Sequence, residues 1–124
     1  MLLALAACDS TGPKIRNVAG AWTASWSISG NGPSCVITTP MTLTQTGGAF
    51  NGTYGPGTMT CDGQTTTLLG SVTSGVVEGD SVTFDIESPS LHQAGRFANS
   101  VEMSGTSIGS GGSFVFSGPW TAHR

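Results

Sequence analysis

The sequence predicts an all-β fold with almost no helix, closed into an eight-stranded antiparallel up-and-down barrel. Charged residues make up only 9% of the 124 residues, and glycine alone supplies 19 positions. Residues that sustain solvent-facing helices are scarce, while Thr, Val, Phe and Trp recur at alternating positions and favour strands. A chain of this length holds one domain, since compact domains cluster near roughly 100 to 150 residues.

Alternating apolar and polar residues indicate eight strands, each with one buried face. In the first, Trp22 and Trp26 share one face while Thr23 lies on the other. The expected strands cover residues 22–28, 41–46, 50–54, 68–72, 82–86, 90–97, 101–105 and 114–122. Residues 90–97 are the least regular of them, since Pro89 and Gly95 fit a long loop as well as a strand.

Closure of the sheet follows because eight short strands with one apolar face would otherwise expose that face and two edges. Up-and-down order sends alternate connections to the same end of a barrel. Three connections of one set are long, whereas the other set are tight turns at the end that also holds both termini. The long connections are residues 29–40, 55–67 and 88–95. Cys35 and Cys61 fall in two of them, so the topology permits a disulfide.

The N-terminus ends an apolar run with Leu5-Ala6-Ala7-Cys8, which resembles the lipobox of bacterial lipoproteins. The resemblance implies that Cys8 is acylated and anchors the protein to a membrane, with residues 1–7 left from a signal segment. No Lys or Arg precedes the run, which is shorter than the roughly 7 to 15 residues of a signal core. A start codon assigned too far downstream explains both departures; the alternative is an apolar tail with a chance cysteine.

The lipoprotein interpretation predicts how the rest of the chain is divided. Residues 8–17 form a flexible tether and residues 18–124 the barrel domain. Without Cys8, the remaining Cys35 and Cys61 are an even pair in a compartment where disulfides persist. We therefore expect a Cys35–Cys61 disulfide and a location in the bacterial envelope, at either the inner or the outer membrane.

Charge and spacing exclude several classes of function. A net charge of −3 with only four Lys and Arg offers no basic stripe, so we expect no nucleic-acid partner. His92 and His123 lie far from each other and from the cysteines, which gives no compact metal-ligand spacing and no nucleophile beside a base. Asp85 and Glu87 share a face that fits a solvated strand better than an acid–base pair. We expect no catalytic residue, metal or cofactor.

Two short features resemble a known family. Gly20-Ala21-Trp22 at the start of the first strand, with Arg124 at the end of the last, is similar to the pattern of lipocalins and the wider calycins. The resemblance implies that Trp22, Trp120 and Arg124 plug the closed end, with Arg124 lying across the Trp22 ring. Avidins share this architecture, but residues without amide or hydroxyl groups stand where a biotin site needs them: Ala24, Ile28 and Pro56.

The expected function is non-catalytic binding, with two alternatives beside a purely structural lipoprotein. A carrier would hold a small apolar ligand in the barrel mouth. Its lining would be Trp26, Met41, Tyr54, Leu68, Ile86 and Phe114. A protein-binding module would resemble bacterial envelope inhibitors of lysozymes or metalloproteases. Glycines at inward positions supply either barrel curvature or space for a ligand: Gly52, Gly70, Gly105 and Gly118.

Overall fold

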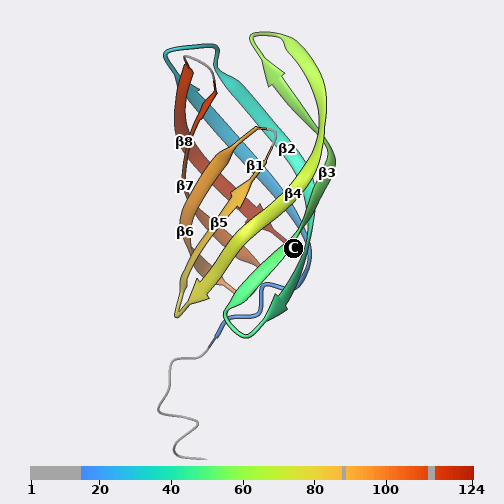
Figure 1. Ribbon diagram of the computed structural model, residues 1–124, viewed down its shortest axis with the longest axis vertical. Helices are drawn as coiled ribbons and strands as arrows, with labels where there is room; N and C mark the ends of the chain where they lie inside the picture. Colours follow the sequence, from blue (N-terminus) through green and yellow to red (C-terminus); the bar gives the residue numbers. More distant parts are fainter. Residues whose placement is uncertain (1–14, 88, 112–113) are drawn as a thin grey trace, which may run out of the picture.

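In the computed structural model, the described residues form eight antiparallel strands closed into one barrel, as the sequence predicts (Figure 1). The structure describes residues 15–87, 89–111 and 114–124, which include no helix long and apolar enough to cross a membrane. Each strand pairs with the next, and the last pairs with the first. The strands are β1 (Gly20–Gly30), β2 (Cys35–Thr46), β3 (Ala49–Cys61), β4 (Gln64–Glu78), β5 (Ser81–Ile86), β6 (Leu91–Asn99), β7 (Glu102–Gly111) and β8 (Phe114–His123).

The predicted long connections are wrong, because most of their residues extend the strands. Only residues 31–34 separate β1 from β2, and residues 87–90 separate β5 from β6. The β3–β4 connection is the two-residue turn Asp62-Gly63, in which both residues have positive φ, as tight hairpins require. The sequence around Gly55 has the composition of a loop, but the structure accommodates it as an irregularity in the β3–β4 register.

The strand alternative for residues 90–97 is correct, and the whole segment except its first residue lies in β6. Leu91, Gln93 and Phe97 are buried in alternation with exposed residues, and β6 pairs with both β5 and β7. Pro89 lies in the preceding turn, where it interrupts no ladder. Gly95 is needed within the strand because a Cβ there would lie 2.2 Å from the carbonyl oxygen of Ser104 and 2.8 Å from the ring of Trp120.

The barrel has a closed end and an open end. Tight turns at residues 47–48, 79–80 and 100–101 lie at the closed end, together with the segment that enters β1 and the C-terminal residue Arg124. The turns at 31–34, 62–63 and 87–90 lie at the opposite, open end (Figure 1). This sorting of connections follows from up-and-down order and agrees with the sequence-based topology.

Aromatic side chains fill the barrel, and inward glycines make room for them. A Cβ on Gly70 would meet the Tyr54 ring at 2.9 Å, and a Cβ on Gly75 would meet the Phe50 ring at 2.5 Å. Other inward glycines let adjacent strands approach, since a Cβ would lie about 2 Å from a neighbouring carbonyl oxygen: Gly52, Gly105 and Gly118. These glycines therefore serve packing and close strand approach, and do not leave ligand space.

The Cys35–Cys61 disulfide is confirmed, but it joins strands rather than loops. The two residues are direct neighbours across the β2–β3 ladder, with a Cα–Cα distance of 4.2 Å and an S–S distance of 2.06 Å. The bridge fastens the open-end extension of the β3–β4 hairpin to β2.

Removing this bridge should destabilise the fold. The double variant Cys35→Ala with Cys61→Ala should lose about 2–4 kcal/mol of unfolding free energy, because the unfolded chain regains the freedom of a loop spanning 26 residues. Chemical denaturation measures this loss. Alanine at the exposed cross-strand pair Thr38 and Thr58 on the same two strands is the control and should cost no more than about 1 kcal/mol. Equal stability of the cysteine variant and the parent would contradict a structural role.

Candidate functional site

The closed end brings Trp22 and Arg124 together. The guanidinium carbon of Arg124 lies 4.4 Å from the Trp22 ring centroid, within cation–π range. The indole N–H of Trp22 donates to the carbonyl oxygen of Val18 at 2.8 Å. The guanidinium also donates to three backbone carbonyls, those of Asn17, Ala19 and Ser100. These contacts join the entry into β1, the β6–β7 turn and the chain end across the bottom of the barrel.

Trp120 lies apart from this group, in the middle of the barrel. Its backbone pairs with Trp26 across β1 and β8, and its ring packs edge-on against Phe84 at a centroid distance of 5.3 Å. It therefore contributes to the core beside Trp26 rather than to the Arg124 contact. Strand order alone could not predict how far along the barrel axis Trp120 lies, because the β1–β8 register depends on the tilt of the strands in the closed barrel.

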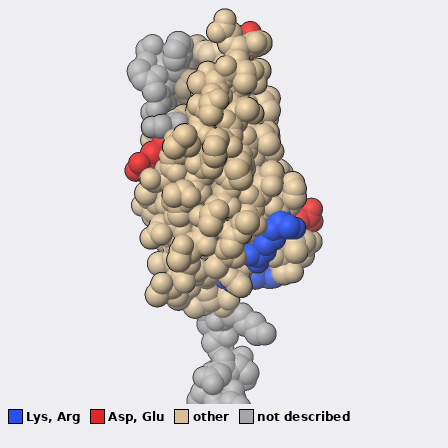
Figure 2. Space-filling view, turned by 90° about the vertical axis from the view of Figure 1, so that its right-hand side faces the viewer, with Lys and Arg blue, Asp and Glu red and all other residues tan. Residues whose placement is uncertain are grey.

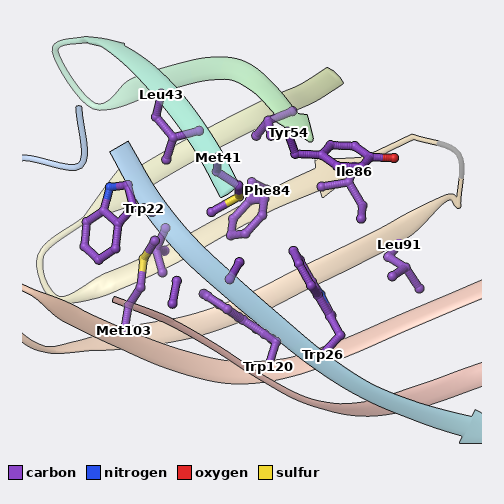
Figure 3. Packing of buried hydrophobic residues seen from close by; sticks show 14 of the residues in the cluster. Trp22, Trp26, Met41, Leu43, Tyr54, Phe84, Ile86, Leu91, Met103 and Trp120 are labelled. Atoms are coloured by element: carbon purple, nitrogen blue, oxygen red, sulfur yellow. The ribbon is translucent and has the colours of Figure 1, made fainter. Parts of the chain in front are cut away.

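The residues predicted to line a ligand pocket are packed core residues. Trp26, Met41, Tyr54 and Ile86 are each at most 2% exposed, and Leu68 is 7% exposed. Figure 3 shows the side chains of Trp26, Trp120 and Phe84 together in the interior of the barrel. Phe114 begins β8, but its side chain lies outside the described residues. Side chains this inaccessible to water leave no enclosed hollow of molecular size inside the barrel, so its interior is filled around them.

A buried polar cluster completes this packing. The side-chain oxygen of Gln93 accepts from the Trp26 indole N–H at 3.1 Å and from the Ser107 hydroxyl. Its amide nitrogen donates to the carbonyl oxygens of Phe84 and Leu91, both at 3.1 Å. Both ends of the Gln93 amide are thus used within the protein. Its position on the inward face of residues 90–97 was the sequence feature that could have revealed it.

Tyr54 ends in a similarly satisfied contact. Its hydroxyl donates to the backbone carbonyl oxygen of Glu87, next to the β5–β6 turn. Burial raises the pKa of the Tyr54 phenol above its usual value of 10.0, and the negative charge of Glu87 raises it further. The phenol therefore stays protonated at neutral pH and acts as a fixed donor that ties β3 to the rim.

A cleft lies at the open rim of the barrel. β5 ends at Ile86, whereas β4 and the β7–β8 hairpin continue past it, so the short β5–β6 hairpin forms the floor of a notch. The notch encloses about 660 Å³. It is lined by Thr73, Asp85, Ile86, Glu87, Ser90, Leu91, His92, Ile108, Gly109 and Val115. Of the predicted ligand-lining residues that the structure describes, only Ile86 belongs to it.

Polar and apolar groups face each other in this cleft. His92 Nδ1 lies 2.5 Å from the Asp85 carboxylate, because the two residues are opposed across the β5–β6 ladder. The pair orients the imidazole. Ile108 pairs with His92 across the next ladder and is 55% exposed, and Val115 is 60% exposed. The described residues contain no group of three or more His, Cys, Asp or Glu side chains that could hold a metal ion.

On the side of the barrel shown in Figure 2, charged side chains are few and widely spaced. Further exposed apolar residues occur at the same end as the cleft on β2 and β4, Val36 and Leu69. Single exposed apolar residues such as these are common on proteins, whereas Ile108 and Val115 are exposed apolar residues that line the cleft itself.

Comparison of this chain with protein-family models, curated proteins and solved structures finds no match. The likeness to lipocalins thus rests on the barrel and on the contact of Trp22 with Arg124.

Truncation of Trp22 should cost about the same stability as truncation of Trp26. Trp22→Ala and Trp26→Ala should each lose about 3–5 kcal/mol of unfolding free energy, because both side chains are buried and leave cavities. Chemical denaturation of the two variants makes the comparison, and the parent should bind no apolar fluorescent probe in its interior. A much smaller loss for Trp26→Ala, together with probe binding, would show that space already exists beside it.

The stability of the fold should fall above pH 10 through Tyr54. There the unfolded chain ionises its phenol while the folded chain still holds the proton, so ionisation favours unfolding. Tyr54 is the single tyrosine, so phenolate absorbance of the folded protein reports its titration directly. In Tyr54→Phe this contribution is absent, and the stability difference between parent and variant should shrink as the pH rises past 10. A constant difference over that range would contradict the shift.

Proposed function

We propose that this protein is a non-catalytic binding module of a bacterial envelope, and that its open-end cleft holds a segment of a partner protein. One observation carries the proposal: the interior is filled, while the rim presents a cleft of about 660 Å³ with exposed aliphatic walls. Binding then takes place at the rim, outside the core.

The shape of the cleft favours a protein over a small molecule. Small-molecule sites enclose most of their ligand, typically 70–90% of its surface. Here Ile108 and Val115 remain more than half exposed, so a bound molecule of small size would keep much of its own surface in water. A protein covers the rim as well as the cleft. Its complementary segment would place an aliphatic side chain against these walls and hydrogen-bond donors toward Asp85 and Glu87.

A carrier of a small apolar ligand is the second candidate. The volume of the cleft lies within the range of about 300–1,000 Å³ typical of small-molecule sites. Leu91 and Ile86 provide an apolar floor, and the oriented His92 adds one polar contact. The ligand would then sit at the mouth, above the packed core.

Anchoring through Cys8 is part of the proposal, although Cys8 lies outside the described residues. Further along the chain, residues 16–18 are held at the closed end, where Arg16 pairs with Asp80 at 2.9 Å and Gln45 bonds both Arg16 and Val18. A tether at this end would direct the cleft away from the membrane. Membership of the lipocalin-like barrels of bacterial lipoproteins is proposed with it, on the lipobox and the contact of Trp22 with Arg124.

The test uses the anchored protein purified from its own envelope. Native mass spectrometry should detect a bound protein, and Ile108→Lys should remove it because a charge replaces an aliphatic wall of the cleft. Val101→Lys is the matched control, since Val101 is also exposed but lies at the closed end. Retention of a small molecule that Ile108→Lys displaces would favour the carrier. If Ile108→Lys still carries every bound molecule that the parent carries, binding at the cleft is contradicted.

Lipid anchoring through Cys8 is tested separately, by membrane fractionation. Cys8→Ala should release the protein from the membrane fraction if the chain is expressed with its full-length start. Unchanged fractionation would contradict lipidation without touching the cleft.

A further inference from the structure

Among the residues that the structure describes, the first half of β4 has a strand neighbour on one side only. On the β3 side the ladder runs to the turn, where Cys61 pairs with Gln64. On the β5 side the first paired residue is Val72, opposite Ile86, and one further bond joins the Glu87 N–H to the Ser71 carbonyl. Residues 64–70 therefore form a sheet edge above the short β5–β6 hairpin (Figure 1).

The backbone groups on this edge can be assigned by alternation. In an antiparallel ladder, successive residues direct their N–H and C=O groups to opposite neighbours. The Ser71 carbonyl bonds to Glu87 on the β5 side, so Leu69, Thr67 and Thr65 direct their groups to that same side. The β3–β4 hairpin gives the same assignment. Residues that flank a two-residue turn bond to each other, so the backbone groups of Gln64 point to β3 and those of Thr65 point to the edge.

The edge lacks three of the features that natural proteins use to block strand pairing. Those features are charged side chains, proline, or a very short edge strand. From Gly63 to Val77 the sequence holds no charged residue and no proline. Residues 64–67 are exposed on both faces, and Leu69 is 66% exposed. The segment Thr65-Thr66-Thr67 also has high strand propensity.

We propose that a second copy of this chain pairs antiparallel with this edge, β4 against β4. A two-fold axis sets the same segment against itself, so any charge on it would meet its own like charge. An uncharged threonine segment suits self-pairing for that reason. Symmetry about Thr66 sets Thr65 opposite Thr67 of the other copy, and such threonine pairs are favourable. The two β2–β3–β4 sheets then become continuous.

This inference rests on the β4 edge and is independent of the function proposed for the cleft. Its test is the oligomeric state of the full chain, measured by sedimentation velocity over a concentration series. We expect a concentration-dependent dimer. Hydrogen exchange should show the N–H groups of Thr65 and Thr67 protected in the dimer and exchanging fast on dilution.

Substitutions at one position locate the interface. Thr67→Pro removes an edge N–H without breaking the β3 ladder, and Thr67→Lys sets like charges beside the two-fold axis. Each should raise the dimer dissociation constant by about tenfold or more. Thr58→Lys is the matched control, because Thr58 is the direct β3 neighbour of Thr67 and is paired on both sides. It should leave the dimer intact.

Three outcomes would overturn the proposal. One is a parent protein that stays monomeric at every concentration; a different polypeptide bound at the edge would then identify another occupant. Another is a dimer that both Thr67 variants leave unchanged. The third is equal weakening by Thr58→Lys and Thr67→Lys, which would place the contact on the outer face of the sheet. If Thr67→Pro fails to fold, Thr67→Lys and the exchange rates still decide.

Discussion

Closure of the sheet onto a space only as wide as its own side chains is the constraint on which this structure depends. An eight-stranded barrel has an interior that side chains just fill. Here Trp26, Trp120 and Phe84 fill the middle, and Trp22 fills the closed end under Arg124. Large rings fit because glycines face them, as Gly75 faces Phe50. Rings and glycines are therefore complementary parts of one packing arrangement.

The filled interior determines where function can lie. Polar atoms inside the barrel are satisfied there, as the Gln93 amide illustrates, so the core offers a ligand neither space nor donors. The open rim differs because β5 and β6 are short. That single difference in strand length leaves both a cleft beside His92 and an edge along the first half of β4. The two features are adjacent, but the cleft offers side chains for contact whereas the β4 edge offers backbone N–H and C=O groups.

Local patterns predicted the fold class and strand order well, and failed where register and strand length mattered. Alternation located a strand in each of the eight places, but loop-like residues around Gly55 hid the extension of β3. The inward parity of Trp26 and Tyr54 was visible in the sequence, while the absence of space beside them was not. Asp85 was expected on a solvated strand face, and no partner was expected for His92. The two residues face each other only because residues 91–99 form a strand that pairs with β5. The sequence left open whether residues 90–97 form a strand or a long loop.

The sequence by itself determined the all-β class, the closed up-and-down topology and the Cys35–Cys61 disulfide, because alternation, glycine turns and connection parity are local or follow from chain order. The tertiary structure decided the level of Trp120, the packing of the interior, the position of the cleft and the bare edge of β4. Each of these depends on how far neighbouring strands extend and how they are staggered around the barrel. That stagger is set jointly by all eight strands, so no single segment of sequence encodes it.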